Sequence, residues 1–294
     1  MSYFVINEEL LAEIEMLETL IRNNVAGMFG GNHRSRNFGS SCEFADYRDY
    51  ADGDDTGKID WNAYARFEKL YLKLYLDERQ MHTRIYIDAS RSMEHGDRTK
   101  AEQSIRIAAL IAYLSVAEMD KVSIYAIKEG TLIPVITNIV GKENYLARIG
   151  ELNSIVFDGD SHISDAILPS TVGYGDGMSV IISDFLTDND YENALNHLAT
   201  KRRDIFCVQV LSREELNPLT RGKVHLFDSE SDGKEYRRHV DREIAAAYKR
   251  ALAYLTDKIR DMCSSRGGEY VLVSAEDSVS DVFFNKMIST GVVK

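Results

Sequence analysis

The sequence has little proline and little cysteine. Each occurs three times among 294 residues, and no stretch rich in proline, glycine and serine divides the chain. The cysteines, Cys42, Cys207 and Cys263, are odd in number and far apart, so neither a disulfide framework nor a paired zinc-ligand spacing is visible.

Long hydrophobic runs are also missing. No stretch approaches the ~18 consecutive apolar residues that indicate a transmembrane helix. The first residues, MSYFVINEELLAEIEM, lack the basic region and apolar run of a secretory signal. The sequence therefore predicts a cytoplasmic protein without a membrane span.

Positive charge is outnumbered by negative charge. The formal net charge is −12 and the sequence pI is about 5.1, which argues against nucleic acid or an anionic membrane as the main partner. Hydrophobic residues make up 44% of the chain, enough for a sizeable core, so wholesale disorder is excluded.

From residue 82 onward, apolar runs typical of strands alternate with helical patterns. We expect strands at 82–88, 121–127, 131–137, 178–184, 204–211 and 268–274, and helices at 99–118, 142–152, from 163, at 189–202, 239–264 and 278–289. The alternation predicts an α/β fold with a mainly parallel sheet, right-handed crossovers and helices on both faces.

Two segments depart from this alternation. The Glu129-Gly130 turn is too short for a crossover, so strand 131–137, which contains Pro134, should be antiparallel and lie at an edge. Residues 213–238 break the pattern before the last long helix, and we interpret them as an inserted hairpin.

Polar oxygen-bearing residues follow two of the expected strands. The run Ile85–Ile87 ends in Asp88, Ser90 and Ser92, and the run from Val180 ends in Asp184. Ligands of open α/β sheets bind at the carboxyl ends of strands. Carboxylates and hydroxyls suit a hard cation, so we predict a Mg²⁺ site, with Mn²⁺ or Ca²⁺ as substitutes.

A third segment completes the expected ligand set. The spacing Asp-x-Ser-x-Ser is that of the metal-ion-dependent adhesion site and resembles the von Willebrand factor A fold. Such sites commonly add a hydroxyl from Gly-Gly-Thr-Asp. Here Ser161 stands in the Thr position and His162 in that of the Asp, with Ser164 and Asp165 as alternatives.

The resemblance also implies how the site works. Proteins of this type leave one coordination position open, which a carboxylate of a partner protein fills. Residues at the rim would tune partner choice, and we assign this role to Arg91, Met93, Glu94 and His162.

The amino-terminal part differs in character. Apolar residues at three- and four-residue steps predict a helix over 7–27, with Asn7 as its cap, that docks on the main domain. Residues 30–68 are rich in Gly, Asp, Arg and aromatics. We interpret the charged members as a buried paired network and the aromatic ones as anchors: Glu43, Phe44, Arg48, Tyr50, Asp54, Asp55, Asp60, Trp61 and Arg66.

The order of these residues resembles a bacterial signature. It is similar to that of the domain of unknown function numbered fifty-eight, which joins such a segment to a von Willebrand A-like domain. An Arg is usual before Ile59-Asp60-Trp61, where this chain has Gly57-Lys58. The resemblance implies partnership with a MoxR-type AAA+ ATPase, or its client, in complex assembly. We therefore expect a segment 1–78 packed on a domain 79–294.

Three alternatives compete with a metal-dependent binding module. Residues 52–60 match part of a calcium-binding loop, but its twelfth position is Ala63 instead of Glu. A strand-end Asp88 also resembles the nucleophile of haloacid dehalogenase-type phosphatases, although Ser90 replaces their acid/base. Finally, the serines and aspartates could simply cap helices in a metal-free scaffold.

Overall fold

A computed structural model describes residues 5–24, 35–38, 44–77, 80–94, 99–175, 177–186, 191–218, 222–227, 235–240 and 242–288. The chain forms two compact units. The larger combines residues 1–25 with 81–293, and the smaller comprises residues 26–80. Each is described by itself.

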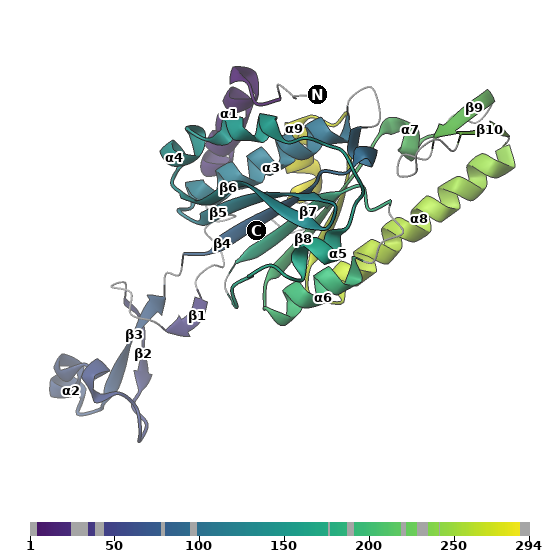
Figure 1. Ribbon diagram of the computed structural model, residues 1–294. Helices are drawn as coiled ribbons and strands as arrows, with labels where there is room; N and C mark the ends of the chain where they lie inside the picture. Colours follow the sequence, from purple (N-terminus) through teal and green to yellow (C-terminus); the bar gives the residue numbers. More distant parts are fainter. Residues whose placement is uncertain are drawn as a thin grey trace. The chain divides into compact units, whose positions relative to one another are not determined.

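A six-stranded sheet forms the centre of the larger unit (Figure 1). Its order is β11-β8-β7-β4-β5-β6, and every neighbouring pair is parallel except β5 with β6. The strands are β4 (His82–Asp88), β5 (Lys121–Lys128), β6 (Thr131–Val140), β7 (Met178–Ser183), β8 (Asp204–Leu211) and β11 (Glu269–Ser274). This is the mainly parallel α/β sheet with one antiparallel edge strand that the sequence predicts.

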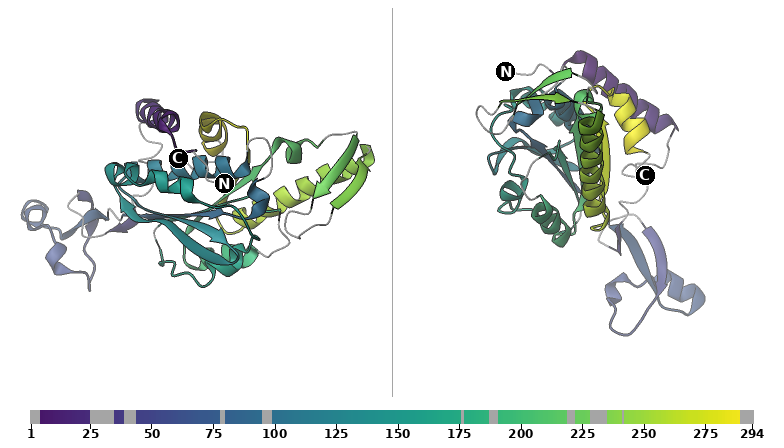
Figure 2. Two further views of the ribbon diagram at one scale, coloured as in Figure 1. Left: turned by 45° about the horizontal axis from the view of Figure 1, so that its top comes forward. Right: turned by 90° about the vertical axis from the view of Figure 1, so that its right-hand side faces the viewer.

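Helices cover both faces of this sheet (Figures 1 and 2). One face carries α1 (Glu8–Asn24), α3 (Lys100–Ala117), α4 (Lys142–Leu146) and α9 (Val279–Asp281), which continues as π-helix over Val282–Met287. The other face carries α5 (Ile163–Ile167), α6 (Glu192–Thr200) and α8 (Arg242–Ser264). Short 3₁₀ helices lie at Arg91–Glu94 and Ile149–Ser154.

The antiparallel edge strand follows from a tight turn. Glu129 and Gly130 have φ of 47° and 72°, the left-handed pair that a two-residue hairpin needs. The inserted hairpin is present too, as β9 (Gly222–Phe227) paired antiparallel with β10 (Glu235–Val240). A short helix that the sequence did not predict, α7 (Arg213–Leu216), precedes it.

The first helix belongs to the larger unit. The side chain of Asn7 caps α1 by accepting the amide of Leu10 over 2.9 Å. Leu10, Ile14 and Leu17 of α1 are buried, and the helix contacts α3 and α9. Helix α1 therefore docks on the sheet domain as expected, and the smaller unit comprises residues 26–80 of the segment expected at 1–78.

The smaller unit is a three-stranded antiparallel arrangement with one helix. Its strands are β1 (Ser35–Phe38), β2 (Phe44–Asp49) and β3 (Tyr71–Asp77), with β3 in the middle, and its helices are a 3₁₀ turn at Thr56–Lys58 and α2 (Trp61–Phe67). Asp60 is 5% exposed and caps α2 through the amides of Asn62 and Ala63. It also accepts the Tyr47 hydroxyl over 2.8 Å.

The buried network expected for this signature is wrong for most of its members. Arg48 pairs with Asp54 over 2.6 Å, but 51% of the Arg48 side chain is exposed. Asp55 only caps the 3₁₀ turn, and Arg66 is exposed. Trp61 is 61% exposed and does not anchor the unit. A unit of this size has too little interior to bury so many large side chains.

Two of the other signature residues lie outside what the structure describes. These are Glu43 and, for its side chain, Phe44. Tyr50 is half-buried at the end of β2, where its amide donates to the carbonyl of Leu70.

Candidate metal centre at the ends of β4 and β7

The strand order creates a switch point between β4 and β7. From β4 the chain proceeds through β5 and β6 toward one edge, whereas β7, β8 and β11 follow toward the other. Ligands of such sheets bind outside the carboxyl ends of strands at this point. The parallel register pairs Ile87 with Ile182, so Asp88 and Ser183 come next, side by side.

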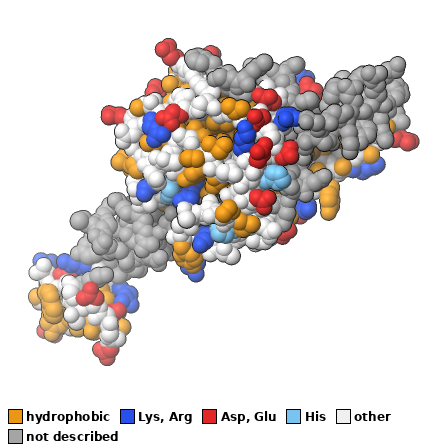
Figure 3. Space-filling model, in the orientation of Figure 1, with side chains coloured by type: hydrophobic (Ala, Val, Ile, Leu, Met, Phe, Trp, Pro, Cys, Tyr) orange, Lys and Arg blue, Asp and Glu red, His pale blue; other side chains and the backbone are white. Residues whose placement is uncertain are grey.

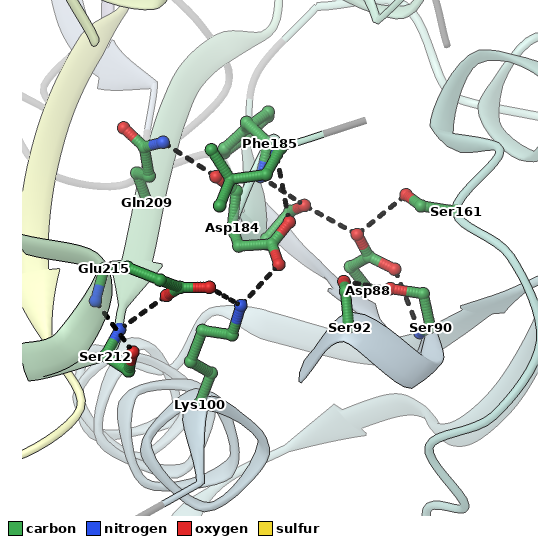
Figure 4. Close-up of polar contacts among 12 residues, drawn as sticks. Asp88, Ser90, Ser92, Lys100, Ser161, Asp184, Phe185, Gln209, Ser212 and Glu215 are labelled. Carbon is green, nitrogen blue, oxygen red and sulfur yellow. Dashed lines mark hydrogen bonds and ion pairs between the residues drawn. The ribbon is translucent and has the colours of Figure 1, made fainter. Parts of the chain in front are cut away.

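Asp88 is fully buried and surrounded by serines (Figure 4). Its Oδ2 accepts hydrogen bonds from the hydroxyl of Ser161 over 2.8 Å and from that of Ser183 over 2.6 Å. Its Oδ1 accepts the amide of Ser90 over 3.1 Å. Three chain segments therefore fix one carboxylate.

The loop after β4 carries the other two serines of the motif. The hydroxyls of Ser90 and Ser92 lie 3.1 Å apart. The amide of Arg91 donates to the carbonyl of Gly159, which ties this loop to the segment that carries Ser161. The expected ligands Asp88, Ser90, Ser92 and Ser161 are thus gathered in one place.

Asp184, the fifth expected ligand, is 2% exposed and paired with a lysine. Its Oδ2 lies 2.7 Å from the Nζ of Lys100, and its Oδ1 accepts the amide of Leu186. The same Nζ lies 2.7 Å from Oε1 of Glu215 on α7. Figure 4 shows Asp184 between Asp88 and Lys100, with Glu215 on the far side of the lysine.

Burial and charge act against each other in this cluster. Burial raises the pKa of Asp88, and the nearby charge of Asp184 raises it further, although three serines pull it down. Burial lowers the pKa of Lys100, but Asp184 and Glu215 outweigh it, so the pKa lies above its usual value. The lysine therefore stays charged.

The charges of the cluster do not balance. Three carboxylates, those of Asp88, Asp184 and Glu215, face one ammonium group, and Asp88 forms no ion pair with any residue that the structure describes. An ionised Asp88 needs such a partner, and without one its raised pKa favours the neutral acid. A divalent cation would supply the missing charge, and the carboxylate and hydroxyl oxygens present are the donors that Mg²⁺ prefers. The residues therefore fit the metal.

Three of the four residues assigned to the rim are exposed at least in part. Arg91 and Glu94 are exposed and His162 is 36% exposed at its side chain, but Met93 is fully buried. The 3₁₀ turn at Arg91–Glu94 directs Met93 into the core, so its assignment to the rim is wrong.

The two alternatives to Ser161 point elsewhere. Ser164 accepts the amide of Ala194 at the start of α6. The Asp165 side chain is 75% exposed and lies near His162. Ser161 is therefore the hydroxyl of this loop that contacts Asp88.

Three residues of the cluster were missed from the sequence. Ser183 could have been predicted. It directly precedes Asp184 in its strand, and parallel pairing with the strand that ends at Asp88 places it beside that carboxylate. No local pattern marks Lys100 or Glu215. Lys100 is 84 positions away from Asp184 in the sequence, and Glu215 is 115 positions away from Lys100.

Neither unit contains a helix, among those the structure describes, that is long and apolar enough to cross a membrane. Two solved structures resemble the chain at low identity. An aerotolerance-related membrane protein from Bacteroides fragilis is 15% identical, with 72% of this chain and 98% of that chain covered and a TM-score of 0.41. The VWA domain of SpRpn10 is 12% identical, with 70% and 94% covered and a TM-score of 0.39.

Sequence comparison identifies the family. Uncharacterized proteins of Mycobacterium tuberculosis and Mycobacterium bovis are 25% identical over 230 residues, covering 76% of this chain and 72% of theirs. The family described as "Protein of unknown function DUF58" matches residues 46–257. This span exceeds half of the sequence, and the chain therefore belongs to that family.

Proposed function

We propose that this chain is a non-enzymatic protein-binding module that holds Mg²⁺ through Asp88, Ser90, Ser92, Ser161 and Asp184. When bound, the cation would neutralise buried carboxylates and attract a carboxylate of a partner protein. The observation that supports this best is the fully buried Asp88, which accepts three hydrogen bonds but has no cationic partner in the described part of the chain.

The proposed partner class is supported by the sequence resemblance and by the charge of the rim. The resemblance stated above implies a MoxR-type AAA+ ATPase or its client. Arg91 is exposed beside the centre, and its positive charge would attract a partner segment that presents an acidic side chain. We propose an adaptor role in complex assembly or maturation.

A phosphatase is the main alternative, and the geometry gives it little support. An Asp nucleophile must reach its substrate, whereas Asp88 is fully buried and held by Ser90, Ser161 and Ser183. The acid/base position is Ser90. Lys100 faces Asp184 and Glu215, and its 1% exposure leaves it little access to a phosphate.

Calorimetric titration of Mg²⁺ into chelator-treated protein tests the proposal. We expect the wild type to bind, and the isosteric variants Asp88→Asn and Asp184→Asn to lose most of this binding, because each removes a negative charge at the centre. Asp165→Asn is the matched control, since Asp165 is an exposed carboxylate on the neighbouring helix α5. Thermal unfolding of each variant verifies that it is folded.

The partner is tested in the same design. A purified MoxR-type ATPase should bind the wild type in Mg²⁺ and not in chelator, and should not bind Asp88→Asn. If Asp88→Asn in chelator bound the ATPase as tightly as the wild type does in Mg²⁺, the metal-bridged mechanism would be disproved. Turnover of a generic phosphate ester that requires Mg²⁺ and Asp88 would replace it with the phosphatase.

A further inference from the structure

Lys100 occupies an electrostatically unfavourable place in its own helix. It is the first residue of the 18-residue helix α3, directly after the cap Thr99. The amino-terminal end of a helix carries partial positive charge and disfavours cations. Lys100 is nevertheless 1% exposed, so its position depends on Asp184 and Glu215 and not on the helix.

Stability is a weak explanation for this arrangement. A buried lysine between two carboxylates loses its hydration, and replacement of such groups by apolar residues often leaves a protein equally stable or more so. What distinguishes Lys100 is the identity of its partner. Asp184 is also a carboxylate of the candidate metal centre, so Lys100 and a bound metal ion would both interact with it.

We propose that Lys100 is an internal cation that competes with the metal for Asp184, and that Glu215 sets the strength of this competition. The inference rests on the proposed function, because it concerns the affinity of the same centre. Removing the lysine frees Asp184 for the metal. Removing the charge of Glu215 leaves Asp184 as the carboxylate that pairs with Lys100, which strengthens the Lys100–Asp184 ion pair that competes with the metal.

Glu215 connects this competition to the segment that follows. Its Oε2 accepts the amide of Ser212 in the capping box that begins α7, while its Oε1 accepts Lys100. On α8, burial raises the pKa of Tyr248, and the charge of Glu215 adds to the effect while that of Lys100 opposes it. Helices on both sides of the β9–β10 hairpin therefore adjoin the residues that tune the metal centre.

Two substitutions should change Mg²⁺ affinity in opposite directions. We expect Lys100→Met to raise it about 10-fold or more, within the range that groups next to ligands produce. Glu215→Gln should lower it, by a smaller factor because Glu215 acts through the lysine. A purely structural role predicts that both variants bind more weakly. Calorimetric titration of Mg²⁺ into the full chain measures both.

A double variant separates competition from net charge. Lys100→Met with Glu215→Gln keeps the formal charge that these two residues and Asp184 carry in the wild type, yet it frees Asp184. It also avoids the two unpaired carboxylates that could unfold Lys100→Met. We expect it to bind Mg²⁺ more tightly than the wild type. Lys142→Met is the matched control, because Lys142 pairs with Glu18 of α1 and not with the centre.

The outcomes are distinct. Tighter binding by the double variant, with weaker binding by Glu215→Gln and no change in Lys142→Met, supports the competition. If the wild type binds Mg²⁺ and the double variant binds it equally well or not at all, the competition is overturned and the proposed function stays intact. Binding by the double variant but not by the wild type supports the competition and overturns Mg²⁺ binding by the natural chain. Absence of binding in both overturns both proposals.

Discussion

The hydroxyl of Ser183 donates to Oδ2 of Asp88 over 2.6 Å, across the ends of two neighbouring parallel strands. The same hydroxyl oxygen accepts the amide of Phe185 over 3.0 Å. Ser183 is fully buried, so this one side chain orients the carboxylate of β4 and the turn that leads from β7 into Asp184. The Ser183 side chain therefore links β4 and β7 at the switch point of the sheet.

Ser183→Ala should weaken the candidate metal centre. The substitution removes a donor to Asp88 and leaves the Phe185 amide without this acceptor, which should cost about 1–3 kcal/mol of unfolding free energy. Loss of a group that orients a metal ligand typically weakens metal binding about 10- to 100-fold. Urea denaturation and Mg²⁺ calorimetry measure the two effects.

Ser154→Ala is the matched control for this variant. Its hydroxyl is exposed and donates to the carbonyl of Glu151, so both measurements should equal those of the wild type. Unchanged Mg²⁺ affinity in Ser183→Ala, together with its loss in Ser161→Ala, would assign the orientation of Asp88 to Ser161 instead.

The metal-centre residues that the sequence predicted share a simple origin. Hydrophobic runs locate the ends of β4 and β7, and parallel topology brings those ends together, so Asp88 and Asp184 could be predicted from local patterns. Lys100 could not. A lysine in the first turn of a helix is usually solvated, and its burial depends on where α3 begins relative to the end of β7.

Burial was the harder property to predict elsewhere too. Met93 follows two metal-motif serines, but a 3₁₀ turn directs it inward. Trp61 has the composition of an anchor, yet a three-stranded unit with one short helix offers it too little interior. Periodicity identifies the face of a long element, and it says little about turns and small units.

His82 should make the fold sensitive to mild acid. Burial, with Arg84, Arg203 and Lys121 nearby, lowers its pKa to about 4, and its Nε2 lies 2.9 Å from the Ser123 hydroxyl. An unfolded histidine has a pKa near 6.5. Between these values the unfolded chain binds more protons, so stability is lost as pH falls from about 6.5 to about 4.

The variant His82→Gln tests this contribution. Because His82 is only about half buried, solvent screening reduces this contribution. Over that window the wild type should lose about 1–2 kcal/mol of unfolding free energy through this residue, and the variant should lack that part. Urea denaturation at neutral pH and near the lower end of the window measures it. His162→Gln, on a partly exposed side chain, should retain the wild-type pH dependence; an equal flattening there would contradict the assignment.

Asp60→Ala should destabilise the smaller unit without affecting the metal centre. The side chain caps α2 and accepts the Tyr47 hydroxyl, and loss of such a cap weakens the helix that it begins. Trp61, the single tryptophan of the chain, is the next residue and reports on this unit by fluorescence. We expect its unfolding midpoint to fall while Mg²⁺ affinity stays constant.

The exposed Asp52→Ala variant controls for loss of an acidic residue in the same unit, and its tryptophan transition should match the wild type. If Asp60→Ala also reduced Mg²⁺ affinity, the smaller unit would be coupled to the centre energetically. That result would contradict the treatment of the two units as separate in function.

Hydrogen exchange of α7 should respond to Mg²⁺ through Lys100. If a bound metal ion interacts with Asp184, the ammonium group of Lys100 pairs mainly with Glu215. The stronger ion pair then fixes Glu215 more firmly in its capping box with Ser212. We therefore expect amides of residues 213–217 to exchange more slowly in Mg²⁺ than in chelator. In Lys100→Met the difference should vanish even though Mg²⁺ still binds. Because coupling between two sites is reciprocal, a partner that immobilises α7 should in turn raise Mg²⁺ affinity in the wild type alone. Slower exchange in both proteins would show that the metal reaches α7 by a route that does not include the lysine.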